Sequence, residues 1–179
     1  MYCIMECISL EIKIPEKRIA VLIGTGGATK KALEKTFGCR LKISSDGDVE
    51  ISSKDTGMAL RAKEAVTAIA RGFSPQHAMI LSDEEHVLEI INLIDYVGTS
   101  EKALERFRSR LIGTRGKARA NIEEITETHI SIAGKTVAII GTPENVKHAR
   151  DAIELLLSGR SHTSSYIFLR KQKEREKVF

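Results

Sequence analysis

Two glycines three residues apart, with basic residues around them, are the part of this sequence best suited to chemistry. Gly113 and Gly116 belong to an Ile-Gly-x-x-Gly motif, and a helical pattern begins directly after it. Glycines let the backbone turn tightly and let another group come close. The start of a helix adds free N–H groups and the positive end of its dipole, which together favour a phosphate. The candidate site comprises the turn, the isoleucine before it and the nearby basic residues: Arg110, Ile112, Gly113, Thr114, Arg115, Gly116, Lys117 and Arg119.

The same motif occurs earlier in the chain. Ile23-Gly24-Thr25-Gly26-Gly27 lies 89 residues before Ile112-Gly113-Thr114-Arg115-Gly116, and at this offset Leu33, Leu41 and Ile43 also match apolar residues. Either motif alone is weak evidence, because a helix–turn–helix corner with a solvated basic face would look similar. An internal repeat of this length instead indicates two copies of one small domain.

The positive charge of the protein lies in its second half. The net charge is +4; residues 1–89 carry 12 Lys+Arg and 13 Asp+Glu, whereas residues 90–179 carry 16 and 11. There is no acidic residue between Arg106 and Ala120, and this interval is centred on the second glycine turn. A local positive field of this kind holds polyanions. We therefore interpret the second turn as a clamp for a nucleic-acid backbone, with a solvated helix face as the alternative.

The hydrophobic patterns around both turns predict the same order of elements: strand, helix, helix, strand, strand, helix. In the first copy, alternating apolar residues predict a strand over 8–14, and Asp46-Gly47 predicts a hairpin turn. In the second copy we expect a strand within 86–96 and a helix that begins at Thr142-Pro143. This order predicts antiparallel hairpins and an α+β fold.

The repeat also predicts the domain boundaries. We expect a first domain over 1–72, a linker over 73–85, a second domain over 86–160 and a tail over 161–179. Apolar residues in the tail, Tyr166, Ile167 and Phe168, are expected to pack on the body. The charged run over 170–177 is expected to be a solvated helix end.

The element order, with Ile-Gly-x-x-Gly between the first two helices, resembles the type I KH domain (βααββα). The resemblance implies two tandem domains, each a three-stranded antiparallel sheet packed against three helices. It also implies that each GxxG loop clamps about four nucleotides of single-stranded RNA. Bases would lie in an apolar groove between the helices and the strand 130–132, with Ile112 as one wall.

A closer resemblance covers residues 111–140 and the tail. The segments 112–119, 122–126 and 134–141, and the ending Gly159-Arg160-Ser161-His162, are similar to archaeal tandem-KH ribosome-assembly proteins. These are related to the eukaryotic "partner of Nob" or dimethylase-interacting pre-rRNA processing factors. The resemblance implies binding near the 3′ end of small-subunit ribosomal RNA. It further implies partnership with the Nob-type endonuclease and with the alpha subunit of initiation factor two.

The first copy matches the binding motif less well. Its turn has no basic residue at the tip, and its lysines lie further along the next helix. Its candidate residues are Gly24, Thr25, Gly26, Gly27, Lys30 and Lys31. We expect this copy to bind RNA more weakly or to serve as a protein-docking surface, and a purely bracing role is the alternative.

The sequence does not predict an enzyme, a metal site or a cofactor. Its five histidines show no metal-helix spacing, and neither glycine turn has the length or the Gly-Lys-Ser/Thr ending of a Walker loop. Cys3, Cys7 and Cys39 are too few for a disulfide framework, and no apolar run reaches the roughly 20 residues of a membrane span. We expect a cytoplasmic protein. A protein-interaction scaffold, or a general RNA-binding accessory of RNA degradation or translation, remains the alternative function.

Overall fold

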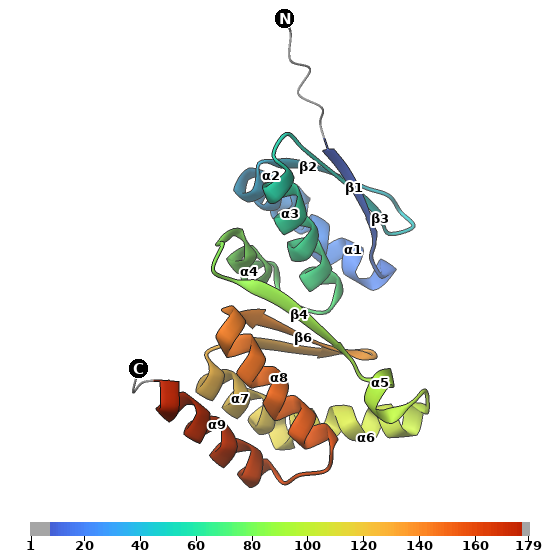
Figure 1. The fold of residues 1–179 in the computed structure, drawn as a ribbon. Coiled ribbons are helices and arrows are strands. Elements are labelled where there is room, and N and C mark those ends of the chain that lie inside the picture. The colour runs from blue at the N-terminus through green and yellow to red at the C-terminus, as the bar shows by residue number, and fades with distance from the viewer. Residues whose placement is uncertain (1–7, 177–179) are drawn as a thin grey trace, which may run out of the picture. The chain divides into compact units, whose positions relative to one another are not determined.

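The computed structural model of the chain describes residues 8–176, and these form two compact units that divide between Glu84 and Glu85 (Figure 1). Cys3 and Cys7 lie outside the described residues. Cys39 has a free thiol, and burial raises the pKa of that thiol.

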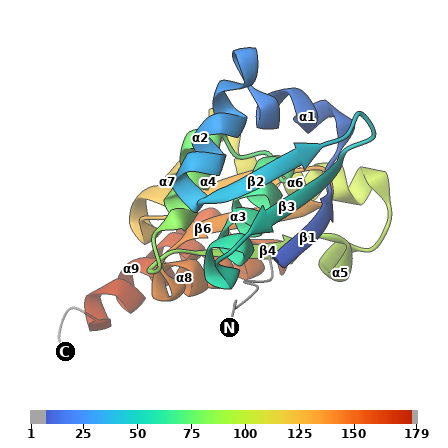
Figure 2. The same cartoon turned by 90° about the horizontal axis from the view of Figure 1, so that it is seen from above.

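The first unit contains a three-stranded sheet and the helices that cover one face of it. Its elements are β1 (Ile8–Lys13), α1 (Glu16–Ile23), α2 (Ala28–Phe37), β2 (Cys39–Ile43), β3 (Asp48–Ser53) and α3 (Thr56–Ala70). The strand order is β1-β3-β2 and both pairings are antiparallel, so β3 lies in the middle (Figure 2). The order of elements along the chain, strand, helix, helix, strand, strand, helix, is the one that the hydrophobic patterns predicted.

Local signals in the sequence set the ends of these elements. The side chain of Asp55 accepts a hydrogen bond from the Met58 N–H and so caps α3. Gly38 ends α2 in the left-handed region, and its N–H donates to the Glu34 carbonyl. Leu41 of β2 and Ile51 of β3 are paired on neighbouring strands, and both are buried in the core.

Residues 73–84 form part of the first unit. They contain α4 (Pro75–Met79) and a 3-10 turn, η2 (Ile80–Ser82), and both pack on α3. The side chains of Phe73, Ala78 and Leu81 are buried. Arg18 of α1 adds two hydrogen bonds, to the Ile69 carbonyl at 2.7 Å and to the Phe73 carbonyl at 2.5 Å. The stretch predicted as a linker therefore contributes apolar side chains to a packed structure.

The second unit repeats the first and adds two helices. Its elements are β4 (Val87–Asn92), α5 (Ile94–Val97), α6 (Glu101–Ile112), α7 (Lys117–Thr126), β5 (His129–Ala133), β6 (Thr136–Gly141), α8 (Pro143–Leu157) and α9 (His162–Glu176). The strand order β4-β6-β5 is equivalent to that of the first sheet. Ile130 pairs with Ile139 as Leu41 pairs with Ile51. The predicted α+β fold with two βααββα copies is confirmed.

The strand predicted within 86–96 is shorter than expected. It ends at Asn92, and Ile94–Val97 form the short helix α5. The Asn92 side-chain oxygen accepts from the Ile94 N–H at 3.3 Å, which bends the chain away from the sheet. Tyr96 then donates to Glu154 of α8 at 2.8 Å, and this bond, together with one from Arg150, lowers the pKa of Glu154.

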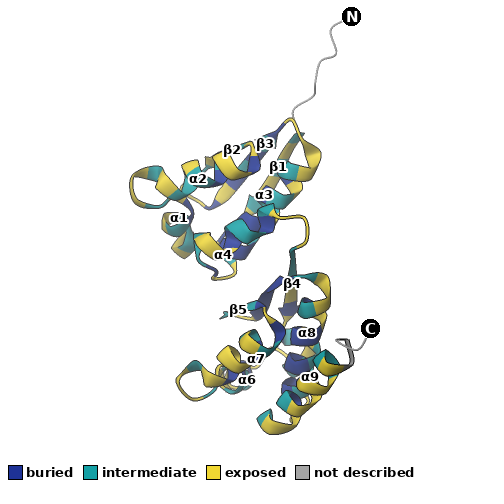
Figure 3. Ribbon diagram, turned by 90° about the vertical axis from the view of Figure 1, so that its left-hand side faces the viewer, coloured by how far each residue is buried: buried dark blue, intermediate teal, exposed yellow. Residues whose placement is uncertain are grey.

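The tail forms helix α9, which packs on α7 and α8 (Figure 3). Ser165 and Leu169 are buried, and Tyr166 is half-buried against the core. The expectation was wrong for Ile167, which remains 51% exposed, whereas Phe168 is 39% exposed and lines a hollow together with Leu155 and Leu157 of α8. A helix presents residues four apart on one face, so 165 and 169 point inward together.

Candidate nucleic-acid interface

The second glycine turn joins α6 to α7 with two internal hydrogen bonds. The Gly113 N–H donates to the Ser109 carbonyl at 2.8 Å and ends α6. The Gly116 N–H donates to the Gly113 carbonyl at 3.2 Å, which closes a 3-10 turn directly before α7. Thr114 and Arg115 lie at the tip of this turn and are exposed. The turn therefore presents two side chains to solvent from a hydrogen-bonded backbone.

The first glycine of the turn is required by packing. Gly113 has φ +70° and ψ 178°, and a Cβ atom there would lie 2.6 Å from the Ala118 Cβ and 2.9 Å from the Ala118 backbone nitrogen. Gly24 in the first unit has the same conformation, and its Cβ would lie 2.3 Å from the Thr29 Oγ1. In both units the first glycine of the turn therefore packs closely against the first residues of the helix that follows it.

The second variable position of the Ile-Gly-x-x-Gly motif distinguishes the two copies. Arg115 has φ +53° and ψ 31°, and the equivalent Gly26 has φ +59° and ψ 20°. A non-glycine residue in this left-handed region costs about 1–2 kcal/mol. Strain of this kind concentrates at functional sites. The second copy therefore bears a conformational cost that places a guanidinium at the tip of the turn.

Arg115 and Lys117 stand beside an uncapped helix start. Gly116 occupies the N-cap of α7 and offers no side-chain acceptor to the first N–H groups of that helix. Both basic side chains are exposed, and neither makes an ion pair or hydrogen bond with any residue in the described part of the chain. An anion placed over the turn would meet two unpaired cations and the positive end of the helix dipole.

Three other basic residues near the turn have internal partners. Arg108 donates to the Gly134 carbonyl at 2.9 Å, and Arg110 donates to the Arg160 carbonyl at 2.5 Å. Arg119 lies 3.4 Å from a Glu123 carboxylate oxygen, one helical turn further along α7. Arg110 and Arg119 therefore flank the turn while also supporting the structure.

The predicted apolar groove lies between α6, α7 and β5, and it is tightly closed. Ile130 and Ile132 point toward the helices, where they line a space together with Leu111 and Ile122. That space has no room for a water molecule. Ile112 is 38% exposed outside it. Bases would therefore lie across the rim of this groove in the described structure, beside Ile112.

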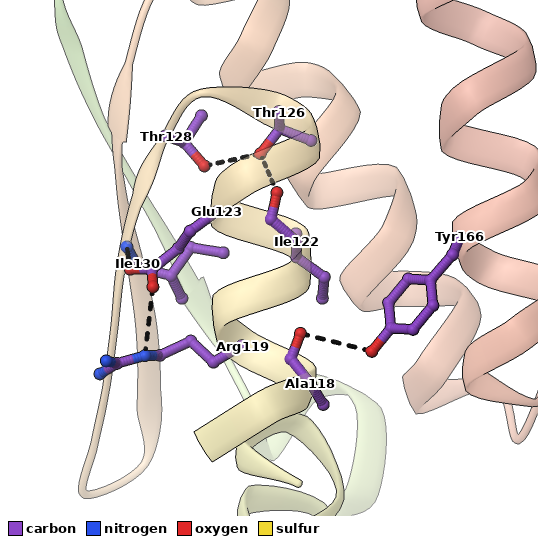
Figure 4. A network of polar contacts seen from close by, with 8 residues as sticks. All are labelled: Ala118, Arg119, Ile122, Glu123, Thr126, Thr128, Ile130 and Tyr166. Carbon is purple, nitrogen blue, oxygen red and sulfur yellow. Dashed lines mark hydrogen bonds and ion pairs between the residues drawn. The ribbon is translucent and has the colours of Figure 1, made fainter.

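A glutamate on α7 binds the edge of the sheet. Glu123 accepts a hydrogen bond at 2.7 Å from the Ile130 N–H on β5, and Figure 4 shows its carboxylate between that strand and Arg119. In the first unit Glu34 accepts from the Leu41 N–H at 2.8 Å. The second pair, Glu123 and Ile130, lies 89 residues after the first, Glu34 and Leu41, which is the repeat offset. Neither glutamate was among the predicted functional residues, although the offset aligns them.

Replacing Glu123 with alanine should reduce the free energy of unfolding by about 1–2 kcal/mol, because the part-buried Ile130 N–H would lose its acceptor. The exposed ion pair with Arg119 contributes little to this value. Urea unfolding measures the change. Glu124→Ala on the exposed face of α7 is the matched control and should stay within about 0.5 kcal/mol of wild type. Equal effects of the two variants would contradict a role for the Glu123 bond.

The opposite face of α7 looks toward α9. Tyr166 of α9 donates a long hydrogen bond, 3.5 Å, to the Ala118 carbonyl (Figure 4). Beside this contact lies an open cavity of about 440 Å³, next to the glycine turn. Asn121, His162 and Tyr166 line it, and these residues were not among the predicted site residues. The available signal for His162 was the ending Gly159-Arg160-Ser161-His162, whose importance came only from the family resemblance.

The first glycine turn has the same backbone and fewer cations. Thr25 and Gly26 form its exposed tip, and Gly27 takes the left-handed N-cap position of α2. Lys30 is half-buried and Lys31 is exposed one turn further along. By the repeat offset, Ala28 stands where the second copy has Lys117. The first turn can therefore offer an anion the start of α2, but it adds little positive side-chain charge.

The described residues show neither a metal cluster nor a membrane-spanning helix. Within residues 8–176, no three His, Cys, Asp or Glu side chains come together as metal ligands. Over the same range, none of the helices combines the length and apolar character needed to cross a bilayer.

The turn geometry and the repeated βααββα order define the class of each unit: both are KH domains. Residues 9–68 match the KH domain, and residues 87–174 match the eukaryotic type KH-domain (KH-domain type I). The chain belongs to the tandem KH-domain family of archaeal Dim2 and eukaryotic PNO1. The predicted family is confirmed.

Three similar proteins illustrate this relationship. A KH domain-containing protein of Methanocaldococcus jannaschii is 43% identical over 175 residues, which span 95% of this chain and 76% of the relative. The crystal structure of an a/eIF2alpha–aDim2p–rRNA complex from Pyrococcus horikoshii contains a chain that is 43% identical with a TM-score of 0.89, covering 94% of this chain and 96% of that one. The pre-rRNA-processing protein PNO1 of Phaeosphaeria nodorum is 28% identical over 129 residues, which span 69% of this chain and 49% of the relative. This chain therefore spans about half of that eukaryotic protein.

Proposed function

We propose that this protein binds single-stranded RNA through its second glycine turn and acts as an assembly or processing factor near the 3′ end of small-subunit ribosomal RNA. The observation that carries the proposal is the exposed Arg115, held in the left-handed region beside Lys117 and an uncapped helix start. A KH turn of this kind clamps a short stretch of single-stranded backbone. The similar aDim2p is in a complex with rRNA, and the PNO1 relative is named for pre-rRNA processing. Both names support ribosomal RNA as the target.

The role that we propose is binding without catalysis. The partners would be the alpha subunit of initiation factor two, which the similar aDim2p complex contains, and the Nob-type endonuclease implied by the family resemblance. The first unit would bind RNA more weakly or provide a protein-docking surface, because its turn lacks the cations of the second. We place this activity in the cytoplasm.

The proposal predicts a steep dependence of RNA affinity on salt. For single-stranded RNA, the logarithm of the binding constant falls with a slope of about −0.7 per contacted phosphate, so roughly three contacts give a slope near −2. Titration of a labelled RNA that matches the 3′ end of small-subunit ribosomal RNA, at several salt concentrations, measures the slope. An unrelated RNA of the same length serves as the control.

The outcomes of this titration separate the candidate functions. Salt-sensitive binding that is selective for the ribosomal sequence supports the proposal. Equal affinity for both RNAs would indicate a general KH accessory of RNA degradation or translation. A folded protein that binds neither RNA would instead be a protein-interaction scaffold, and direct binding of the endonuclease would then be the next measurement.

A further inference from the structure

The cavity between α7 and α9 continues directly from the glycine turn. It has a volume of about 440 Å³, and Gly113, Thr114 and Lys117 of the turn region form one side of it. The rest of the lining includes Arg110 of α6, Asn121 of α7, and His162 and Tyr166 of α9. Three separate helices thus contribute side chains to one hollow that opens beside the candidate phosphate clamp.

The chemistry of the lining favours an anion. Arg110 and Lys117 carry positive charge, His162 is a hydrogen-bonding imidazole, and none of the lining residues is acidic. Two buried nitrogens in this region, Arg110 Nε and His162 Nδ1, have no hydrogen-bond partner among the described residues. Buried polar groups are normally satisfied, so these unpaired nitrogens of two lining residues are compatible with a hydrogen-bonding ligand in the cavity. Asn121 and Tyr166 supply further neutral hydrogen-bonding groups.

Helix α7 has two polar faces, one toward α9 and one toward β5. Lys117 and Asn121 lie one turn apart on the face toward α9, and Arg119 and Glu123 lie on the face toward β5. Figure 4 shows α7 between that strand and the helix that carries Tyr166. The glycine turn stands at the N-terminal end of α7, where both faces begin. An RNA backbone that crosses the glycine turn can therefore pass from the β5 side of α7 to its α9 side.

We infer that this cavity is a second phosphate subsite, which holds a further nucleotide of the RNA strand after that strand crosses the glycine turn. The inference rests on the proposed function, because the same strand must occupy the turn. Lys117 borders both the turn and the cavity, Arg110 and His162 would donate to the additional phosphate, and Tyr166 forms part of the lining. Helix α9 would then have a binding role as well as a packing role.

The test compares RNAs of four and eight nucleotides, with the shorter sequence in the centre of the longer. Wild type should bind the eight-nucleotide RNA about tenfold more tightly, the effect of roughly one charge-assisted hydrogen bond. Two variants address the cavity: His162→Ala removes one donor, and Asn121→Asp adds a negative charge at an exposed position. Each should lose most of the tenfold gain and bind the four-nucleotide RNA as wild type does. Asn145→Asp on α8 makes the same charge change outside the cavity and should alter neither affinity.

Each result has a defined meaning, given unchanged circular dichroism spectra. A gain with RNA length that persists in both cavity variants overturns the subsite. The absence of any gain in wild type overturns it also, while binding of the four-nucleotide RNA would leave the proposed function intact. If wild type binds neither RNA, the proposed function fails and the subsite fails with it.

Discussion

Replacing both tip residues of the second turn, Thr114→Asp with Arg115→Asp, should weaken RNA binding about 100-fold. The change removes an unpaired guanidinium and places two carboxylates where a phosphate would lie, and like charges in contact cost several kcal/mol. The domain should remain folded, because both side chains are exposed and Arg115 makes no bond with a described residue. Aspartate also tolerates the left-handed region better than most residues. Titration of the ribosomal RNA at fixed salt measures the loss.

The first turn provides the matched control. Thr25→Asp with Gly26→Asp changes the equivalent positions, which share the same backbone conformation. We expect at most about a threefold effect, because this turn has no cation at its tip for a phosphate to lose. If the changes at Thr25 and Gly26 abolished binding and those at Thr114 and Arg115 preserved it, the RNA site would belong to the first unit.

Gly113→Ala should reduce the free energy of unfolding by about 3 kcal/mol, the larger of two contrasting glycine effects. The new methyl group would lie 2.6 Å from the Ala118 Cβ, in a backbone region that only glycine adopts readily. Gly116→Ala should cost only about 1 kcal/mol, since its Cβ would meet nothing within 4 Å and only its φ of +78° is unfavourable. Urea unfolding of the two variants measures both values.

The contrast between these glycines determines how the turn should be tested. A charged residue at Gly113 would disturb packing and phosphate contact together, so loss of binding there would have two explanations. The tip residues Thr114 and Arg115 separate the two effects. Equal destabilisation by Gly113→Ala and Gly116→Ala would show that the start of α7 shifts easily, and would contradict the packing argument.

The repeat explains why so much of the fold was predictable. One offset aligned Leu33 with Ile122 and Leu41 with Ile130, and all four side chains are buried in the structure. Turn and cap residues act locally, so Asp46-Gly47 and the glycine turns were visible in the sequence alone. The basic residues near the second turn were visible for the same reason.

The remaining features depend on contacts between distant residues. The end of β4 depends on the Asn92 side chain and on the Leu93 N–H, which donates to the Lys135 carbonyl. The burial of Tyr166 depends on where α9 crosses α7. The sequence shows no hydrogen-bond partner for Arg108 or Arg110, because their partners are backbone carbonyls that lie 26 and 50 residues away. Patterns of hydrophobic spacing contain no information about such pairings.

The glutamates that bind the sheet edges also bear on how this protein avoids aggregation. Strands β2 and β5 lie at the edges of their sheets, where unpaired N–H groups invite strands from other molecules. Glu34 and Glu123 already occupy one such N–H on each strand and add a negative charge beside it. An incoming strand would have to displace a charged hydrogen bond before it could pair. The edges formed by β2 and β5 are therefore each protected against intermolecular sheet extension by a glutamate of the same unit.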